Sequence, residues 1–258
     1  MKAYERLMLA RGKDRASASD YFSRLFDGFI EMHGDRRFGD DKAVIAGLAT
    51  FHGKPVTLIG IEKGKNIKER VAKNFGCAHP EGYRKALLQM KQAEKFDRPV
   101  ICFVDTAGAY CGIGAEERGQ GQAVAECLYE MSVLKVPCVT VITGEGGSGG
   151  ALALSVADEI WMLENAVFSV ISPEGCASIL WKDAKKAQKA AECLKITADD
   201  LLSLKIIDEI ISEEGGLEEI CKKLDEMLVL FLNKQRKKTV DTLIKERYEK
   251  YRNIGRFL

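Results

Sequence analysis

A run of glycines in the middle of the chain constrains its fold more than any other feature. Five of the seven residues from Gly144 to Gly150 are glycine. An apolar, β-branched segment at 137–143 precedes the run, and a segment of small residues at 149–157 follows it. This order predicts a strand, a turn almost without side chains, and then a helix.

The first amide groups of a helix have no partner inside it, and they lie at its positive end. A glycine turn at that place can therefore bind an anion, or an oxygen that becomes negative during a reaction. The run alone is equally compatible with a tight turn that needs glycine only for close packing.

A second unit of the same kind lies directly before the first. A strand at 100–104 leads into a glycine-rich loop at 105–114, and a helix is expected from 115 to about 134. Repeated strand–loop–helix units predict an α/β domain, in which ligands bind at the loops that leave the strand ends. We therefore expect the two glycine loops to face one crevice.

The other elements follow from periodicity and from turn residues. Helices are expected at 20–32, 80–96, 181–194, 217–235 and 239–252, and strands at 43–51, 55–62, 158–163, 167–171 and 206–211. The polar and basic start of the chain predicts a weakly held arm. The expected organisation is an N-terminal arm (1–19), a main domain (20–215) and a C-terminal helical extension (216–258).

Composition narrows the classes of function. The net charge of +1 gives no argument for a nucleic-acid or membrane partner, and no apolar run reaches the length of a membrane span. The eight cysteines form no zinc-binding pattern, so no metal site is predicted. We expect Cys102, Cys127, Cys138 and Cys193 to be small, reduced core residues of a cytoplasmic protein.

Four kinds of chemistry compete for the glycine crevice. Gly146–Gly150 matches the G-x-S-x-G pattern of serine hydrolases, but no histidine follows residue 79 to serve as the base. The loops only loosely resemble the G-x-G-x-x-G of nucleotide-binding folds, and their spacing is wrong for it.

The other two candidates use an oxyanion hole. An acyl-CoA hydratase or isomerase would need carboxylates for proton transfer, for which Glu116, Glu117 and Glu145 are available. An acyl or carboxyl transferase could work with backbone amides alone, which suits a chain with only three histidines.

Longer motifs favour the last of these. The chain closely resembles the carboxyltransferase alpha subunit of bacterial multi-subunit acetyl-CoA carboxylase. The resemblance extends from about residue 20 to the C-terminus and is carried by Gly34–Asp41, Asn74–Gly76, Pro80–Leu87, Gly114–Gln120, Gly144–Leu154 and Ser169–Lys182.

The resemblance implies a crotonase (ClpP-like) fold of repeated β-β-α units, with an N-terminal helix and a C-terminal helical extension. It implies transfer of the carboxyl group of carboxybiotin, held on a biotin carboxyl carrier protein, to acetyl-CoA, giving malonyl-CoA for fatty-acid synthesis. The implied partner is a zinc-bearing beta subunit in an α2β2 heterotetramer, associated with biotin carboxylase in a larger complex. No metal is expected in this chain.

The family's oxyanion hole for the biotin ureido oxygen maps onto the backbone amides of Gly149 and Gly150. Related decarboxylases would shift the hole by one residue, to Gly150 and Ala151. The remaining residues expected to contact substrate are Gly146, Gly147, Ala151, Gly108, Ala109 and Gly112. In this interpretation Ser148 is a spacer and Glu145 has a structural role.

Two positions depart from the family pattern in the second loop, where Ala107 and Cys111 replace prolines. Proline would fix a φ angle that alanine leaves free, so the loop is expected to be softer. Cys111 is expected to be an exposed thiol near the crevice. The alternatives that remain are a hydratase, isomerase or decarboxylase of the crotonase type, and a scaffold subunit without activity.

Overall fold

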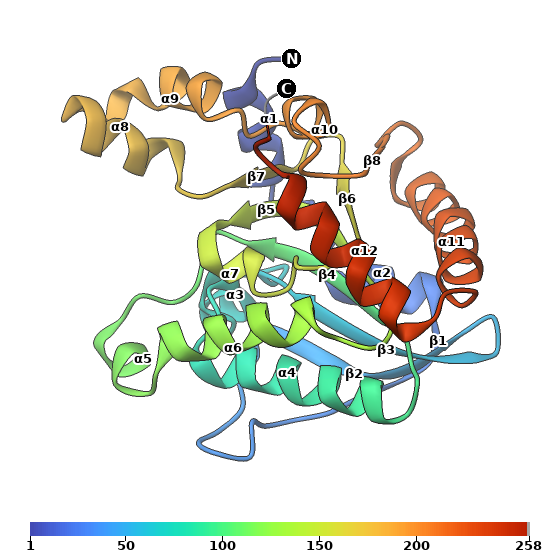
Figure 1. Cartoon of the computed structure of the whole chain (residues 1–258). Helices are drawn as coiled ribbons and strands as arrows, with labels where there is room; N and C mark the ends of the chain where they lie inside the picture. Colours follow the sequence, from blue (N-terminus) through green and yellow to red (C-terminus); the bar gives the residue numbers. More distant parts are fainter. Residues whose placement is uncertain (257–258) are drawn as a thin grey trace.

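The computed structural model describes residues 1–256, built around one mixed β-sheet (Figure 1). The sheet order is β1-β2-β3-β4-β5-β6-β8, and β7 pairs with the far end of β5. The strands are β1 (Asp27–Glu31), β2 (Val44–Phe51), β3 (Lys54–Ile61), β4 (Val100–Thr106), β5 (Cys138–Gly147), β6 (Glu159–Leu163), β7 (Val167–Ser169) and β8 (Glu209–Ile211). The first three strands are antiparallel, and from β3 onward all pairs are parallel.

Helices connect the parallel strands and cover the sheet. They are α1 (Ala3–Ala10), α2 (Ala18–Leu25), α3 (Ile67–Ala72), α4 (Pro80–Lys95), α5 (Ile113–Glu117), α6 (Gln120–Ser132), α7 (Ser148–Leu152), α8 (Pro173–Trp181), α9 (Ala187–Leu194), α10 (Ala198–Ser203), α11 (Gly216–Gln235) and α12 (Val240–Asn253). Short 3-10 turns occur at Asn74–Gly76 and Ala184–Lys186. Helices α4 and α6 lie side by side, whereas α8 and α9 form a pair at one end of the molecule (Figure 1).

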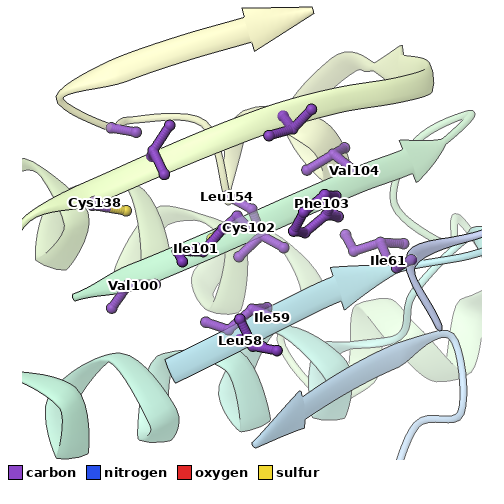
Figure 2. Close-up of a cluster of buried hydrophobic side chains, with 14 of the residues drawn as sticks. Leu58, Ile59, Ile61, Val100, Ile101, Cys102, Phe103, Val104, Cys138 and Leu154 are labelled. Carbon is purple, nitrogen blue, oxygen red and sulfur yellow. The ribbon is translucent and has the colours of Figure 1, made fainter. Parts of the chain in front are cut away.

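The core is centred on β4, in which every residue is buried. Figure 2 shows its apolar side chains between those of β3 and β5, and Val104 is the register partner of Ile61. Tyr21 of α2 stacks on the Phe103 ring with their centroids 5.3 Å apart. Parallel strands covered on both faces read as continuous apolar runs, which is why the segment at 100–104 was recognisable as a strand. The prediction of an α/β domain is confirmed.

The start of the chain differs from the prediction of a weakly held arm. Residues Ala3–Ala10 form α1, and Ala3, Leu7 and Ala10 are buried against Val167, Ala191 and Ile196. Their spacing of four and three residues is helical, but the charged residues between them hide the short apolar stripe.

Several predicted helix boundaries were wrong. The helix expected at 20–32 ends at Leu25, and its second half is β1, which pairs antiparallel with β2 and thereby satisfies its backbone groups. The helix expected at 115–134 is divided at Gly119, whose φ of 81° interrupts the helical path. The helix expected at 181–194 is replaced by α8 and α9, which flank a left-handed Lys182. The helix expected at 149–157 stops at Leu152.

The C-terminal helices agree with the prediction, although residues 257–258 of the expected extension lie outside the described part. Helix α12 is fastened by Arg247, whose side chain is completely buried. Its guanidinium group binds both carboxylate oxygens of Asp158 at 2.8 and 3.0 Å, and it donates to the carbonyl oxygens of Met131, Leu134 and Val136.

The cysteines are reduced, and three of the four expected core cysteines are buried. Cys193 is exposed instead, because α9 turns that side of the helix to solvent. Cys111 is exposed, as expected. None of the helices within residues 1–256 is long and apolar enough to cross a membrane.

Candidate functional site

The two glycine loops lie against each other at the ends of adjacent parallel strands. Strands β4 and β5 are paired along their length, with Thr106 opposite Gly146. A side-chain carbon built on Gly147 would lie 2.0 Å from the carbonyl oxygen of Ala107, and one built on Gly150 would lie 2.4 Å from the amide nitrogen of Ala109. Side chains are therefore excluded at these positions by the backbone of the opposite loop.

The amides of the turn are presented by α7. Gly147 is the N-cap of this helix, so Gly149 and Gly150 are its second and third residues, and their N–H groups have no acceptor within the helix. Ser148 begins the helix at a φ of 51°. Gly149 is half-buried and Gly150 buried, so a ligand would approach from the side of Ser148 and Gly149.

The second loop offers one further amide. The Gly108 N–H donates to the hydroxyl of Thr106 at 3.0 Å, and this hydroxyl donates to the Gly108 carbonyl at 2.9 Å. The amide of Ala109, in contrast, has no acceptor among residues 1–256. Because the Gly108 amide is already used, Ala109 is the better donor of the two.

The other residues expected to contact substrate are less accessible to a ligand. Gly146 is buried and pairs with Phe168 in the ladder between β5 and β7. Ala151 is buried in α7. Gly112 is the N-cap of α5, and its carbonyl accepts from Ala115 at 2.9 Å. These residues shape the loops, and the structure places the accessible amides at Gly149 and its neighbours.

A hollow of about 300 Å³ opens beside Ser148 and Gly149. Its wall is mostly apolar and is completed by Leu152, Phe168, Ser169, Val170, Leu194, Leu201 and Ile206. Leu152 ends α7, but the other residues lie in or near β7, α9 and α10, and sequence reasoning missed them because these segments are far from the glycine motifs along the chain. An apolar wall next to unpaired amides suits a ligand that has a hydrophobic body and an anionic or carbonyl oxygen.

A network of charges lies beneath the turn. The Glu145 carboxylate is bound by Lys63 at 2.6 Å and by Arg11, the C-cap residue of α1, at 2.8 Å, and the Glu145 amide donates to Asp105 at 2.9 Å. Lys63 also binds Asp105 at 2.9 Å, and Arg11 also binds Glu174 of α8 at 2.8 Å. Glu145 therefore holds the turn in place.

The charged state of this network is fixed by its ion pairs. Burial works against the charge of Glu145, but Lys63 and Arg11 outweigh it and lower the pKa of Glu145 below its ordinary value. Burial likewise opposes the charge of Lys63, yet Asp105 and Glu145 raise its pKa. The hydrogen bond from Arg11 lowers the pKa of Glu174. All three groups stay ionised near neutral pH.

We expect Arg11→Ala to lower the free energy of unfolding by about 1–3 kcal/mol at neutral pH, since it removes charge-assisted hydrogen bonds. The substitution returns the pKa values of Glu145 and Glu174 toward ordinary values. A carboxyl whose folded pKa is depressed stabilises the fold above its unfolded pKa, near 4.5 for glutamate, and loses this contribution as pH falls through the folded pKa. The difference between wild type and variant should therefore shrink below about pH 4.5.

Urea unfolding at several pH values measures this difference. The matched control is Lys13→Ala, two residues further along, because Lys13 is exposed and has no ion pair among residues 1–256. A gap between wild type and Arg11→Ala that stays constant from pH 7 to pH 3 would contradict the assignment.

The site geometry argues against two of the competing chemistries. None of the hydrogen bonds among residues 1–256 joins Ser148 to a histidine, and His79 lies instead against the ring of Tyr110, 4.1 Å between centroids. A hydratase would need a free carboxylate at the amides, but Glu145 is held by two cations, and Glu116 and Glu117 point to solvent on α5.

Comparison with known proteins identifies the family. The family model for acetyl co-enzyme A carboxylase carboxyltransferase-like proteins matches residues 1–255. The chain belongs to this family. It is 59% identical over 256 residues to the acetyl-coenzyme A carboxylase carboxyl transferase subunit alpha of Ruminiclostridium cellulolyticum, a match that covers 99% of this chain and 98% of the relative.

A second relative joins two subunits in one chain. The carboxyl transferase subunits beta/alpha protein of Natranaerobius thermophilus is 55% identical over 263 residues, which cover 99% of this chain and 43% of that protein.

Solved structures show the same fold at low sequence identity. A transcarboxylase 12S structure with methylmalonyl-coenzyme A aligns with a TM-score of 0.72 and 19% identity, covering 87% of this chain and 43% of that one. A Pseudomonas malonate decarboxylase hetero-tetramer in complex with coenzyme A aligns with a TM-score of 0.72 and 18% identity, covering 90% of this chain and 92% of that one. These likenesses show the fold, and they confirm the predicted crotonase-type fold.

Proposed function

We propose that the amides of Gly149 and Gly150 form the oxyanion hole of this carboxyltransferase alpha subunit, on the side of the site that receives carboxybiotin. The observation that carries the proposal is the pair of unpaired N–H groups at the start of α7, next to an apolar hollow. Membership of the family supports the activity, which is carboxyl transfer to acetyl-CoA to give malonyl-CoA.

The residues of the hollow fit biotin as a ligand. Leu152, Phe168 and Val170 offer an apolar surface for its ring system, and the turn offers donors for its ureido oxygen. Carboxybiotin, when bound, supplies the carboxyl group and the base that removes the proton of acetyl-CoA. Each donor of an oxyanion hole contributes about a hundred- to a thousandfold in rate, so two amides can drive the release of the carboxyl group without a protein side chain.

The alternative pair, Gly150 and Ala151, is less favourable because Ala151 is buried whereas Gly149 is half-buried. The Ala109 amide is the better third donor, since it is free and borders Gly150. Gly147 and Gly108 keep side chains out of the space between the loops, whereas a side-chain carbon on Gly146 would meet Phe168 and one on Gly112 would meet Tyr110.

The partners follow from the family and from its relatives. A relative that fuses beta and alpha subunits and a hetero-tetrameric structural neighbour support a beta subunit as partner, in an α2β2 assembly. That subunit would provide the acetyl-CoA side of the site and the zinc, while biotin would arrive on its carrier protein from biotin carboxylase. Residues 1–256 contain no cluster of side chains suited to a metal ion.

The decisive experiment is the reverse reaction, in which malonyl-CoA is decarboxylated with free biotin as acceptor. The chain is assayed alone and then mixed with a beta subunit. Activity only in the mixture supports a shared site. Activity from the chain alone would point to a crotonase-type decarboxylase. No activity either alone or in the mixture would favour a scaffold subunit.

A further inference from the structure

A buried hydroxyl without a partner lies at the junction of the two glycine loops. Tyr83 of α4 is completely buried, and no hydrogen-bond partner for its hydroxyl oxygen exists among residues 1–256. A side-chain carbon built on Gly150 would lie 2.8 Å from this oxygen and 2.4 Å from the Ala109 amide nitrogen. The hydroxyl and the free Ala109 amide thus border the same point on Gly150.

The motif that contains this tyrosine places it there. Tyr83 is the fourth residue of α4, which begins with Pro80, and the segment just before the helix is fastened to the second loop. The Tyr110 amide donates to the Ala78 carbonyl at 3.0 Å, and Gln120 donates to the carbonyls of both Ala78 and Tyr110 at 2.8 Å. The first turn of α4 is therefore attached to the loop that carries Ala109.

An unpaired hydroxyl in the interior destabilises the protein in which it occurs, because it has lost its bond to water without replacement. A state in which the hydroxyl donates to an acceptor is therefore stabilised relative to one in which it does not. The Gly108 carbonyl carbon and the Ala109 amide nitrogen border the same point on Gly150 as the hydroxyl, and they follow Ala107, whose φ is not fixed by a proline ring. A small shift of this loop would bring one of its carbonyl oxygens within reach.

We propose that Tyr83 is a positioning residue of the amide site, whose hydroxyl pairs with the backbone at 107–109 when an oxyanion occupies the turn. This inference rests on the proposed function. The ligand draws the Ala109 amide toward the oxygen held by Gly150, and the hydroxyl then gains a bond that it lacks in the empty site. Because this hydrogen bond forms only when the oxyanion is bound, it stabilises the occupied site relative to the empty one.

The test is Tyr83→Phe in the complex with the beta subunit. We expect the free energy of unfolding to stay equal or rise, because phenylalanine removes only the unpaired hydroxyl. We expect kcat for carboxyl transfer to fall about two- to tenfold, the effect of one lost hydrogen bond to a neutral backbone group. KM for malonyl-CoA should change little, since that substrate approaches from the other side of the site.

Tyr251→Phe is the matched control. The Tyr251 hydroxyl is paired, sharing its proton between the carbonyl oxygens of Ser155 at 2.8 Å and Ala157 at 2.9 Å. This variant should lose stability and keep its kcat, which is the opposite pattern.

Wild-type kcat in Tyr83→Phe would overturn the inference, and so would a loss of stability, which would mean that the hydroxyl is already paired in the empty site. Failure of the proposed function looks different, because the wild-type complex itself would then be inactive.

Discussion

Gly150→Ala is expected to abolish most carboxyl transfer, with a loss of a hundredfold or more. The added carbon would lie 2.4 Å from the Ala109 amide nitrogen and 2.6 Å from the Gly108 carbonyl carbon, which are backbone atoms that cannot rotate away. The turn and the second loop must separate, so the amides no longer converge on one oxygen. Loss of a single oxyanion-hole donor already reduces rates by about a hundred- to a thousandfold. Steady-state transfer in the complex with a beta subunit measures the effect.

Gly121→Ala is the matched control, because it separates the loss of the oxyanion hole from the change in helix propensity that any glycine-to-alanine substitution brings. Gly121 lies in α6, and a side-chain carbon built on it has no neighbour within 4 Å. Gly121→Ala should keep its full rate and gain up to about 1 kcal/mol of stability. If Gly150→Ala transferred carboxyl groups as fast as Gly121→Ala, the amides of this turn could not be the site.

Arg247→Ala is expected to lower the free energy of unfolding by about 3–5 kcal/mol. The substitution leaves the buried Asp158 carboxylate without its cation and three carbonyl oxygens without their donor. For a chain of this size, the midpoint of thermal unfolding should fall by about 6–20 °C. Calorimetry or urea unfolding measures the change.

Arg252→Ala, five residues further along α12, is the control, because the side chain at this position is exposed. Its effect should stay within about 0.5 kcal/mol. Equal stabilities of the two variants would show that Arg247 does not fasten the helix.

The sequence predicted the elements whose signal is local. Strand β4 is apolar throughout, α4 begins with proline, and Thr197 caps α10 by accepting from the Asp200 amide, so these elements could be recognised without tertiary information. Strand β1 could not, because Phe29 and Ile30 fit a helical stripe as well as an edge strand. Only the pairing with β2 decides between the two.

The site was predictable in part for the same reason. The glycine run predicts a turn, and the family motif indicates which amides are expected to form the oxyanion hole. Which donors are free depends on contacts between distant segments: the Gly108 amide is used by Thr106, whereas that of Ala109 is not. The Tyr83 hydroxyl and the wall formed by Phe168 and Leu201 depend on the packing of α4, β7 and α10 around the turn.

The attachment of α1 to the glycine turn has a consequence for the order of events during synthesis. Arg11 is made early, but its partners Glu145 and Glu174 follow 134 and 163 residues later. Contacts across such separations form late in folding, because the chain entropy of closing the loop must first be overcome. The contacts of Arg11 at the end of α1 therefore cannot form until β5 and α8 have emerged from the ribosome. The charged support of the turn is among the last parts of the molecule to be completed.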